Sequence, residues 1–403
     1  MDPRVCEKVV MLALYSKVFD VQYIYMSFEF LRWAREERKN FLVVRIGQRE
    51  IDFLLFGKEN GEMHVLAYGS EEISHFTALQ TLERIFARIP HKTSVQELIA
   101  TFDTSSFRAQ SIKLILPPQS PPHRIDKAEA FALERDTRTR AERIFQNLLF
   151  KESGILPSEF SLRKMDILER RIDGYAVPRL EGFKGGEIEF SVLVMFLLET
   201  ALSQVEKFAK ARKISRVRVI HIAEALKVFT SKPGREGVYL CMEEEKTRVA
   251  VHNEGHFLFL GALPMGAHHF AEFFSDVIGM REPSARLLQQ RYFEGTLSEE
   301  VREKVHKYLL PETRKFGTLL REKLLEAKTA LPESVWIFGR GGVLRDLQDV
   351  FSDDMLRDLP FVQRPKTRFL LPKDVWEAGH FPGTQDSLYT ELCLIGAFVL
   401  NRE

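Results

Sequence analysis

A pattern of strand, turn, strand, turn and strand occurs twice in this sequence, about half a chain apart. The first copy, residues 41–69, reads FLVVRIGQREIDFLLFGKENGEMHVLAYG, and the second, residues 237–266, reads GVYLCMEEEKTRVAVHNEGHFLFLGALPMG. In both copies apolar residues alternate, and a turn with asparagine (Asn60-Gly61 or Asn253-Glu254-Gly255) precedes the third segment. This duplication predicts an α/β fold of two lobes, each beginning with a β-meander. The alternative is a pair of unrelated hairpins in a mixed α/β protein.

Composition places the chain among soluble globular proteins. Its 403 residues suffice for two or more domains, and 45% hydrophobic with 29% charged residues is ordinary for such proteins. The net charge of +1 favours neither a nucleic acid nor an acidic membrane as partner. Three scattered cysteines (Cys6, Cys241 and Cys393) exclude a disulfide framework and a four-cysteine metal site.

No targeting segment is predicted. The apolar stretch at residues 9–28 carries Lys17 and Asp20, which a secretory signal would not. The apolar run at residues 190–198 is too short to cross a bilayer. We therefore expect a cytoplasmic protein.

Prolines, glycines and changes of period divide the chain into five segments. We assign them as follows: an aromatic-rich N-terminal extension, either a cover for the first lobe or a partner-binding arm (1–40); the first part of the first lobe (41–117); an inserted small α+β subdomain (118–196); the second part of the first lobe (197–232); and the second lobe (233–403).

Periodicity predicts the elements inside these segments. In the inserted subdomain we expect a helix over 127–151, a strand pair over 159–172 and a strand over 188–195. In the second lobe we expect separate helices over 282–290, 296–308 and 312–330. The basic run over 207–218 is interpreted as a solvated face, with an anionic contact as the alternative.

Three turn-containing stretches are informative: residues 45–52 (RIGQREID), 241–248 (CMEEEKTR) and 338–344 (FGRGGVL). They resemble motifs of the actin-like ATPase superfold, and within it of the bacterial FtsA/PilM group. The family's first phosphate loop, Asp-Ile-Gly-Ser-Ser-Ser-x-Lys, matches residues 45–52, RIGQREID. Its second loop, Asp-Ile-Gly-Gly-Gly-Thr-Thr-Asp, matches residues 241–248, CMEEEKTR. Its adenine-side turn, Thr-Gly-Gly-Gly-x-x-Leu, resembles residues 338–344, FGRGGVL. The resemblance covers about residues 41–400 and implies a two-lobed fold of duplicated ribonuclease-H-like halves with an inserted subdomain.

The resemblance also implies a nucleotide cleft, and the chemistry of this cleft is altered. The positions that the family uses for its two aspartates hold Arg45 and Cys241. The glycines of the second loop are replaced by Glu243, Glu244 and Glu245. A carboxylate about 4 Å from a phosphate costs about 1 kcal/mol in bulk water and about 4 kcal/mol near a protein surface.

We therefore expect a degenerate cleft that is closed by ion pairs of Arg45 and Arg49 with the glutamate triplet. The other residues that the resemblance places in the cleft are Gly47, Thr247, Gly339, Gly341 and Gly342. No cofactor and no catalytic residue are expected, so the chain is interpreted as a pseudo-ATPase. The alternative is weak binding of ATP with Mg²⁺.

Other patterns carry less chemistry. His252 and His256 flank a turn, and His268-His269 follow, but a metal site needs a third ligand that the sequence does not place. We expect surface histidines there. No nucleophile–base arrangement has a recognisable spacing.

The resemblance implies a function through protein contacts. We expect an FtsA-like scaffold of bacterial cell division or envelope assembly that binds protein partners of the division or pilus machinery. The FtsA group ends in an amphipathic membrane helix, whereas this sequence closes with residues 401–403 directly after a helical segment, so we expect contact with the inner face of the membrane only through a partner. The alternative is an ATP-binding, filament-forming FtsA/PilM-like protein that self-associates. A sugar kinase of the same superfold would need a catalytic aspartate, which we do not find.

Overall fold

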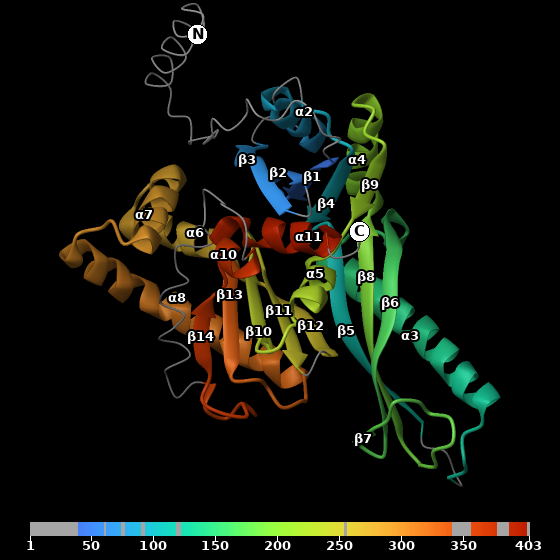
Figure 1. The fold of residues 1–403 in the computed structure, drawn as a ribbon. Coiled ribbons are helices and arrows are strands. Elements are labelled where there is room, and N and C mark those ends of the chain that lie inside the picture. Colours follow the sequence, from blue (N-terminus) through green and yellow to red (C-terminus); the bar gives the residue numbers. More distant parts are fainter. Residues whose placement is uncertain are drawn as a thin grey trace, which may run out of the picture.

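Three β-sheets form the framework of the chain (Figure 1). The computed structural model describes residues 39–59, 62–73, 77–89, 93–117, 122–253, 256–340, 356–376 and 387–400. Residues 1–38 of the predicted extension and the turn residues Asn60, Gly61, Glu254 and Gly255 lie outside the described residues. Among the described helices, none is long and apolar enough to span a bilayer.

The first sheet has five strands in the order β3-β2-β1-β4-β9. β1 pairs antiparallel with β2 and parallel with β4, so a meander is extended by parallel strands. Seven of the eight residues of β1 are buried, as expected for a central strand covered on both faces. The strands are β1 (Lys39–Ile46), β2 (Glu50–Glu59), β3 (Glu62–Glu72), β4 (Glu97–Phe102) and β9 (Arg216–Val219).

The second sheet repeats this topology in the order β12-β11-β10-β13-β14. β10 pairs antiparallel with β11 and parallel with β13, as β1 does with β2 and β4. The repeat confirms the predicted duplication, and the alternative of unrelated hairpins is wrong. The strands are β10 (Gly237–Met242), β11 (Thr247–Asn253), β12 (His256–Leu263), β13 (Ser334–Gly339) and β14 (Lys366–Phe369).

The third sheet, in the order β5-β8-β6-β7, lies between the two parts of the first lobe in the sequence. A long helix, α3 (Lys127–Ser153), packs against it, with the Phe145 ring 5.6 Å from that of Phe196. The sheet includes a strand, residues 107–116, that precedes residue 118, where the inserted subdomain was predicted to begin. Its strands are β5 (Phe107–Leu116), β6 (Phe160–Ile172), β7 (Tyr175–Ala176) and β8 (Ile188–Leu198).

Two elements differ from those that the sequence predicts. Residues 160–172 form one strand, and the predicted strand pair over 159–172 is wrong: register shifts near Leu162 and Ile167 change the alternation without a turn. The predicted helices over 296–308 and 312–330 are one helix, α8 (Glu299–Glu326), which contains Pro311. Pro311 is exposed, and the buried stripe of the helix continues across it, so packing outweighs the missing hydrogen bond.

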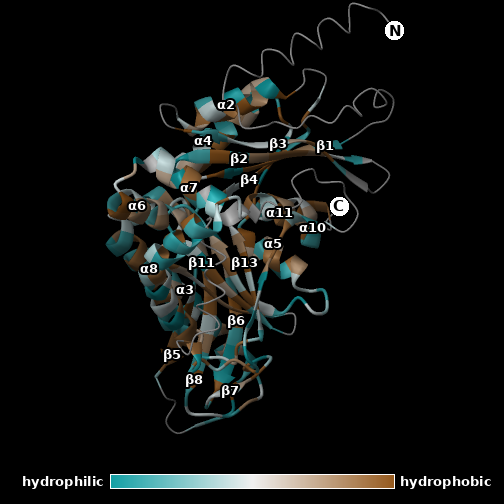
Figure 2. Cartoon of the chain, turned by 90° about the vertical axis from the view of Figure 1, so that its left-hand side faces the viewer, coloured by the Kyte–Doolittle hydropathy of each residue, from teal (hydrophilic) through white to brown (hydrophobic). Residues whose placement is uncertain are grey.

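Helices cover the sheets (Figure 2), and the buried apolar residues form three cores. The first core contains residues of the first sheet together with residues of the second, such as Tyr239 and Phe338. The first core includes side chains of α2 (Ala78–Arg88), α4 (Glu199–Ala211), α5 (Ile222–Phe229), α10 (Pro372–Val375) and α11 (Thr390–Leu400). The second includes α6 (Ala267–Ile278), α7 (Glu282–Glu294) and α8. Two short 3₁₀ helices are η2 (Pro157–Glu159) and η4 (Ser387–Tyr389).

The closing helix α11 joins the two lobes. It follows the second sheet in the sequence, and its buried Leu392, Ile395 and Val399 belong to the first core, which contains strand residues of both lobes. Figure 1 shows α11 between the first and second sheets. Polar side chains on this helix are therefore placed between the lobes.

Candidate functional site

The first turns of the two meanders meet between the lobes. One turn joins β1 to β2 at residues 47–49, and the other joins β10 to β11 at residues 243–246. Arg49 Nη2 lies 3.7 Å from Glu245 Oε1, and this confirms the predicted ion pair between the turns. Both side chains are about one-third exposed, so the pair adds little stability.

Arg45 makes different ion pairs from those predicted. Its Nε lies 2.9 Å from Asp52 Oδ2 and 3.8 Å from Glu391 Oε2, so the expected pairing with the glutamate triplet is wrong for this residue. The reason is the register of the first hairpin, which places Asp52 directly opposite Arg45. Burial opposes the positive charge, but Asp52 and Glu391 outweigh it and raise the pKa of Arg45.

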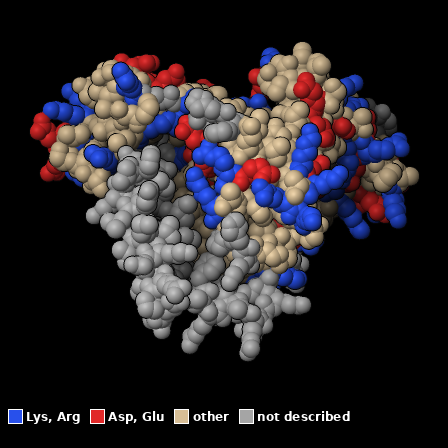
Figure 3. Space-filling model, turned by 90° about the horizontal axis from the view of Figure 1, so that it is seen from above, with Lys and Arg blue, Asp and Glu red and all other residues tan. Residues whose placement is uncertain are grey.

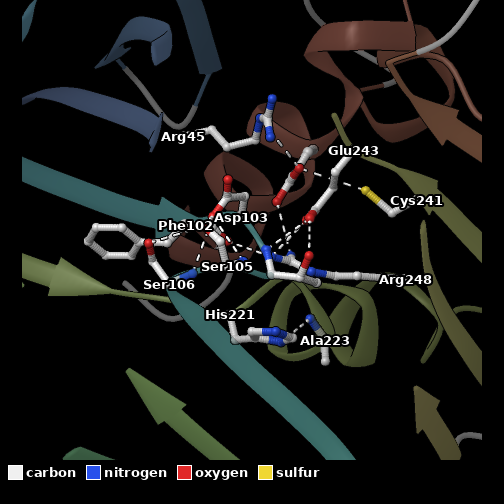
Figure 4. Close-up of polar contacts among 12 residues, drawn as sticks. Arg45, Phe102, Asp103, Ser105, Ser106, His221, Ala223, Cys241, Glu243 and Arg248 are labelled. Carbon is white, nitrogen blue, oxygen red and sulfur yellow. Dashed lines mark hydrogen bonds and ion pairs between the residues drawn. The ribbon is translucent and has the colours of Figure 1, made fainter. Parts of the chain in front are cut away.

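Glu243 binds residues of both lobes (Figure 4). Its Oε2 accepts hydrogen bonds from the backbone N–H of Thr104 at 2.9 Å and from the Thr104 hydroxyl at 2.8 Å. Its Oε1 lies 2.8 Å from Arg248 Nη2. Arg248 in turn donates to the carbonyl of Phe102 and lies 3.4 Å from Glu391. The loop after β4 is thereby bound to the second-lobe turn.

The three glutamates of this turn point to different partners. Glu243 is directed across the cleft to Thr104, Glu244 pairs with Arg286 of α7, and Glu245 pairs with Arg49. The carbonyl groups of Glu243 and Glu244 accept the first N–H groups of α6 at 2.9 and 2.8 Å. The three glutamate side chains of this turn therefore all pair with other groups of the protein.

The glycine turn after β13 packs on the same turn. Gly339 has φ +96°, and a Cβ atom there would lie 2.3 Å from the carbonyl oxygen of Met242. Arg340, the next residue, donates to both carboxylate oxygens of Asp52 and pairs with Glu50. Gly341 and Gly342 lie outside the described residues.

The remaining cleft residues serve the local structure. The Gly47 N–H donates to the carbonyl of Glu50 at 3.0 Å and closes the first turn. The Thr247 hydroxyl donates to the carbonyl of Met265 at 2.8 Å. Neither group is directed to an open space between the lobes.

Burial changes the protonation of several groups here. It raises the pKa of Glu243 to about 7, although Arg248 opposes the shift. It also raises the pKa of the Cys241 thiol well above its usual value. Burial and the nearby Arg248 lower the pKa of His221, and the neutral ring accepts the N–H of Ala223 at Nδ1.

The cleft residues do not fit Mg²⁺ with a nucleotide. Cys241, Glu243 and Glu391 place ligand atoms within 4.8 Å of one another, the only group of this kind among the described residues. The guanidinium groups of Arg45 and Arg248 already contact these carboxylates, and a protonated thiol is a poor ligand for a hard cation. The two carboxylates are therefore paired with guanidinium groups of the protein itself.

One of the four histidines predicted at the surface is buried. His252 is buried, not on the surface, and neither ring nitrogen has a hydrogen-bond partner. His256 is exposed as expected. His268 contacts Arg49 at 2.9 Å, and the Nδ1 of His269 accepts the N–H of Gly266.

A second candidate site is a groove of about 360 Å³ between the third sheet, α5 and the start of β12. Ile167, Leu168 and Phe257 supply its apolar part. Its charged lining is Arg138, Asp166, Arg170 and Lys227. No sequence motif marked this groove, because its residues come from four separate elements.

Comparison with known proteins identifies the fold. No family model and no curated protein matches the sequence. A solved structure of the PilM-PilN type IV pilus biogenesis complex contains a chain that is 16% identical, with a TM-score of 0.60 and coverage of 89% of this chain and 98% of that chain. This chain has the actin-like fold.

Two further solved structures resemble the actin-like fold of this chain more distantly. One is the ethanolamine utilization protein EutJ from Carboxydothermus hydrogenoformans, with 10% identity, a TM-score of 0.46 and 91% coverage of both chains. The other is MreB5 of Spiroplasma citri bound to ADP, with 11% identity, a TM-score of 0.44, and coverage of 90% of this chain and 98% of that chain.

Proposed function

We propose that this chain is a scaffold of pilus or secretion assembly that binds a partner protein and whose interlobe cleft does not bind nucleotide. The observation that carries the proposal is the filled cleft, in which Glu243 contacts Thr104 of the opposite lobe. An actin-like protein with such a cleft acts through its surfaces rather than through ATP hydrolysis.

The charges of the cleft support the absence of nucleotide. A triphosphate at the two turns would face Glu243 and Asp52, which are buried and paired with arginines. Separating these pairs would leave buried charges without partners, at about 3–5 kcal/mol for each broken pair. A nucleotide would also be repelled by the carboxylates that remain.

The groove beside α5 is the proposed docking site. Its apolar residues suit alternate side chains of an extended peptide segment, as in other peptide-binding grooves. Within the described part of the chain, neither Arg138 nor Lys227 forms an ion pair with a carboxylate. We therefore assign the groove to an extended partner segment that carries both apolar and acidic side chains.

The structural comparison supports a partner of the assembly machinery. The similar structure contains PilM together with PilN, a complex of type IV pilus biogenesis. By analogy, the partner of this chain is a component of an envelope assembly machine, and the chain is cytoplasmic and reaches the membrane through that component. Cell division, filament formation and self-association stay predictions that no observation here favours.

A defined peptide tests the groove. We expect a fluorescent peptide of alternating Glu and Leu to bind the wild type in an anisotropy titration. The double variant R138E/K227E should bind roughly tenfold more weakly or not at all. The matched control, K151E/K232E, makes the same change of charge at exposed lysines outside the groove lining and should bind like the wild type. Equal affinities for all three proteins would contradict the assignment.

A nucleotide titration tests the cleft. We expect a fluorescent ATP analogue with Mg²⁺ to show no saturable binding at micromolar concentrations. Micromolar, Mg²⁺-dependent affinity would refute the proposal and favour the ATP-binding, filament-forming alternative. Electron microscopy with nucleotide would then show whether filaments form.

A further inference from the structure

We propose that one face of the first lobe lies directly on an anionic membrane surface. This face, which we call the basic face, consists of Lys207 and Lys210 of α4, Lys213 after the helix, and Arg216 of β9. Figure 1 shows α4 beside α2 at the top of the first lobe, and Figure 3, which looks down on this end, shows Lys and Arg side chains gathered right of centre. The inference rests on the proposed function only in that the partner brings the chain to the membrane.

Positive charge is concentrated in this part of the chain. Residues 199–218 contain six cations and two carboxylates, whereas the net charge of the whole chain is only +1. The field of such a cluster extends over about 10 Å at 0.1 M salt. The small net charge therefore hides a local excess, and the argument from composition against an acidic membrane does not apply to this face.

The three lysines of the basic face are not used by the protein itself. Their side chains are exposed, and within the described part of the chain none of them forms an ion pair or a side-chain hydrogen bond. The arginines beside them are neutralised in part: Arg212 pairs with Glu83 of α2, and Arg216 and Arg218 share the carboxylate of Glu97. The lysines therefore remain available to a ligand from outside.

The spacing of the lysines places them on one side of α4. They are three residues apart, opposite the apolar side chains that the helix buries. Like charges at this spacing repel one another and do not stabilise the helix. The helix dipole favours a cation in the last turn, which accounts for Lys210. It does not account for Lys213, which lies beyond the helix end.

The backbone of Lys213 gives a second and independent indication. Its φ is +56°, one of three positive values at non-glycine residues among the described residues. It directly follows the C-cap Arg212, a position at which glycine is the usual residue because a Cβ atom is strained there. Such strain is typical of residues whose side chains have a function, and this supports a role for the Lys213 ammonium group outside the chain.

A membrane fits this face better than a protein or a nucleic acid. Among the described residues, none of the large apolar side chains that are exposed belongs to α2, α4 or β9, so a protein partner would find no apolar centre for its interface. Binding of a duplex uses about 6–10 phosphate contacts, more than the three free lysines supply. Anionic lipids diffuse within the bilayer, and each lysine near their surface raises the affinity by about fivefold.

The membrane contact complements the groove. Three lysines raise the affinity by only about a hundredfold over a neutral membrane, which does not hold the chain there by itself. Once the partner segment is bound, the second contact becomes intramolecular and is strengthened by the high effective concentration of the membrane. The basic face would then fix the orientation of the first lobe toward the bilayer.

Sedimentation with vesicles tests the proposal. We expect the full chain to bind vesicles of equal parts phosphatidylcholine and phosphatidylglycerol but not vesicles of phosphatidylcholine alone. Binding should weaken as NaCl rises from about 0.01 M to about 0.15 M, because the screening length falls from about 30 Å to about 8 Å. K207E/K210E/K213E should bind about a hundredfold more weakly or not at all. The matched control K151E/K232E/K307E changes the charge equally at exposed lysines of other elements and should bind like the wild type.

Single variants of Lys213 separate binding from stability. K213G removes the ammonium group and relieves the backbone strain, so we expect a higher midpoint of thermal unfolding together with about fivefold weaker binding of the vesicles. K213R keeps the charge and should bind like the wild type. A purely structural role of Lys213 would not make the more stable protein the weaker binder, so K213G with wild-type affinity would contradict the role assigned to this residue.

Three other results would overturn the proposal: no binding of the wild type to the phosphatidylglycerol vesicles at low salt, equal affinities of the two triple variants, or tighter binding to duplex DNA or polyglutamate than to the vesicles. The proposed function is tested separately. K207E/K210E/K213E should bind the groove peptide like the wild type, so a failure of the membrane contact leaves the docking site in place. Failure of the peptide to bind would leave the vesicle result unchanged.

Discussion

Arg340 and Asp52 join the two lobes across 288 positions of sequence. Arg340 follows β13 of the second lobe and donates to both carboxylate oxygens of Asp52 in β2 of the first. The Asp52 side chain is fully buried and is also bound by Arg45. This contact joins the two lobes, so we expect it to determine how firmly they are held together.

Removing the Arg340 guanidinium should open the cleft. In R340A, Asp52 keeps only Arg45, and Glu50 loses its cation. Removing one partner of a buried ion pair lowers the free energy of unfolding by about 3–5 kcal/mol. We expect the lower end of this range because Arg340 is slightly exposed. Calorimetry should show a lower midpoint of thermal unfolding, and small-angle scattering a larger radius of gyration.

The matched control for this change is R302A. Arg302 pairs with Glu299 on the exposed surface of α8, where an ion pair contributes about 0–1 kcal/mol. R302A should therefore unfold like the wild type. Equal effects of R340A and R302A would show that the contact between Arg340 and Asp52 does not hold the lobes.

Gly339 should not tolerate a side chain. Its φ of +96° and the 2.3 Å approach of a Cβ atom to Met242 both oppose G339A, so we expect a loss of more than about 1 kcal/mol. Gly154, the C-cap of α3, has a φ of +69° with no atom within 4 Å of a Cβ position. G154A therefore carries the backbone strain without the clash. Urea denaturation that gives equal losses for both variants would contradict the close approach.

The two β-meanders were predictable from local sequence signals, whereas the full length of helix α8 depends on tertiary packing. The two meanders were predictable because alternating apolar residues and turn residues lie within about 30 residues of each other in each copy. The continuation of α8 through Pro311 was not predictable, because the penalty of a helical proline is local, whereas the burial of Leu309 and Phe316 on either side of it comes from the tertiary structure.

The candidate site was predictable only in part. The pair Arg49–Glu245 followed from the alignment of the two turns with the family's first and second phosphate loops. Neither Thr104 nor Glu391 was predicted as a cleft residue, and they reach the cleft from a loop and a helix that are 287 positions apart. Their roles depend on how the lobes are placed, which no local pattern contains. The burial of His252 was not predictable for the same reason.

Replacing the buried His252 should stabilise the protein. Neither ring nitrogen has a hydrogen-bond partner, and the ring packs 6.3 Å from Phe257. H252L removes an unsatisfied polar group at similar volume, so we expect a gain of about 1 kcal/mol in thermal denaturation. H256L, at an exposed neighbour, should change little. A loss of stability in H252L would contradict this expectation.

The same residue should make stability depend on pH. Burial lowers the pKa of His252 to about 4. Above the ordinary pKa of 6.5 the ring is neutral in both the folded and the unfolded chain, and the stability of the folded protein is lost progressively as the pH falls from 6.5 toward 4. The unfolded chain takes up a proton in this range that the folded ring does not. We expect the wild type to lose about 1.4 kcal/mol per pH unit more than H252L there. Parallel curves for the two proteins would contradict the assignment.

Cys241 should report the opening of the cleft. Its thiol is buried and its pKa is raised, so a thiol reagent should leave it unmodified in the native C6S protein at pH 7.5. Cys393 of α11 is also buried, but its pKa is raised by burial alone, without the cleft carboxylates. In R340A we therefore expect faster modification of Cys241 and not of Cys393, measured by mass spectrometry of peptides. Equal acceleration at both residues would indicate general unfolding rather than separation of the lobes.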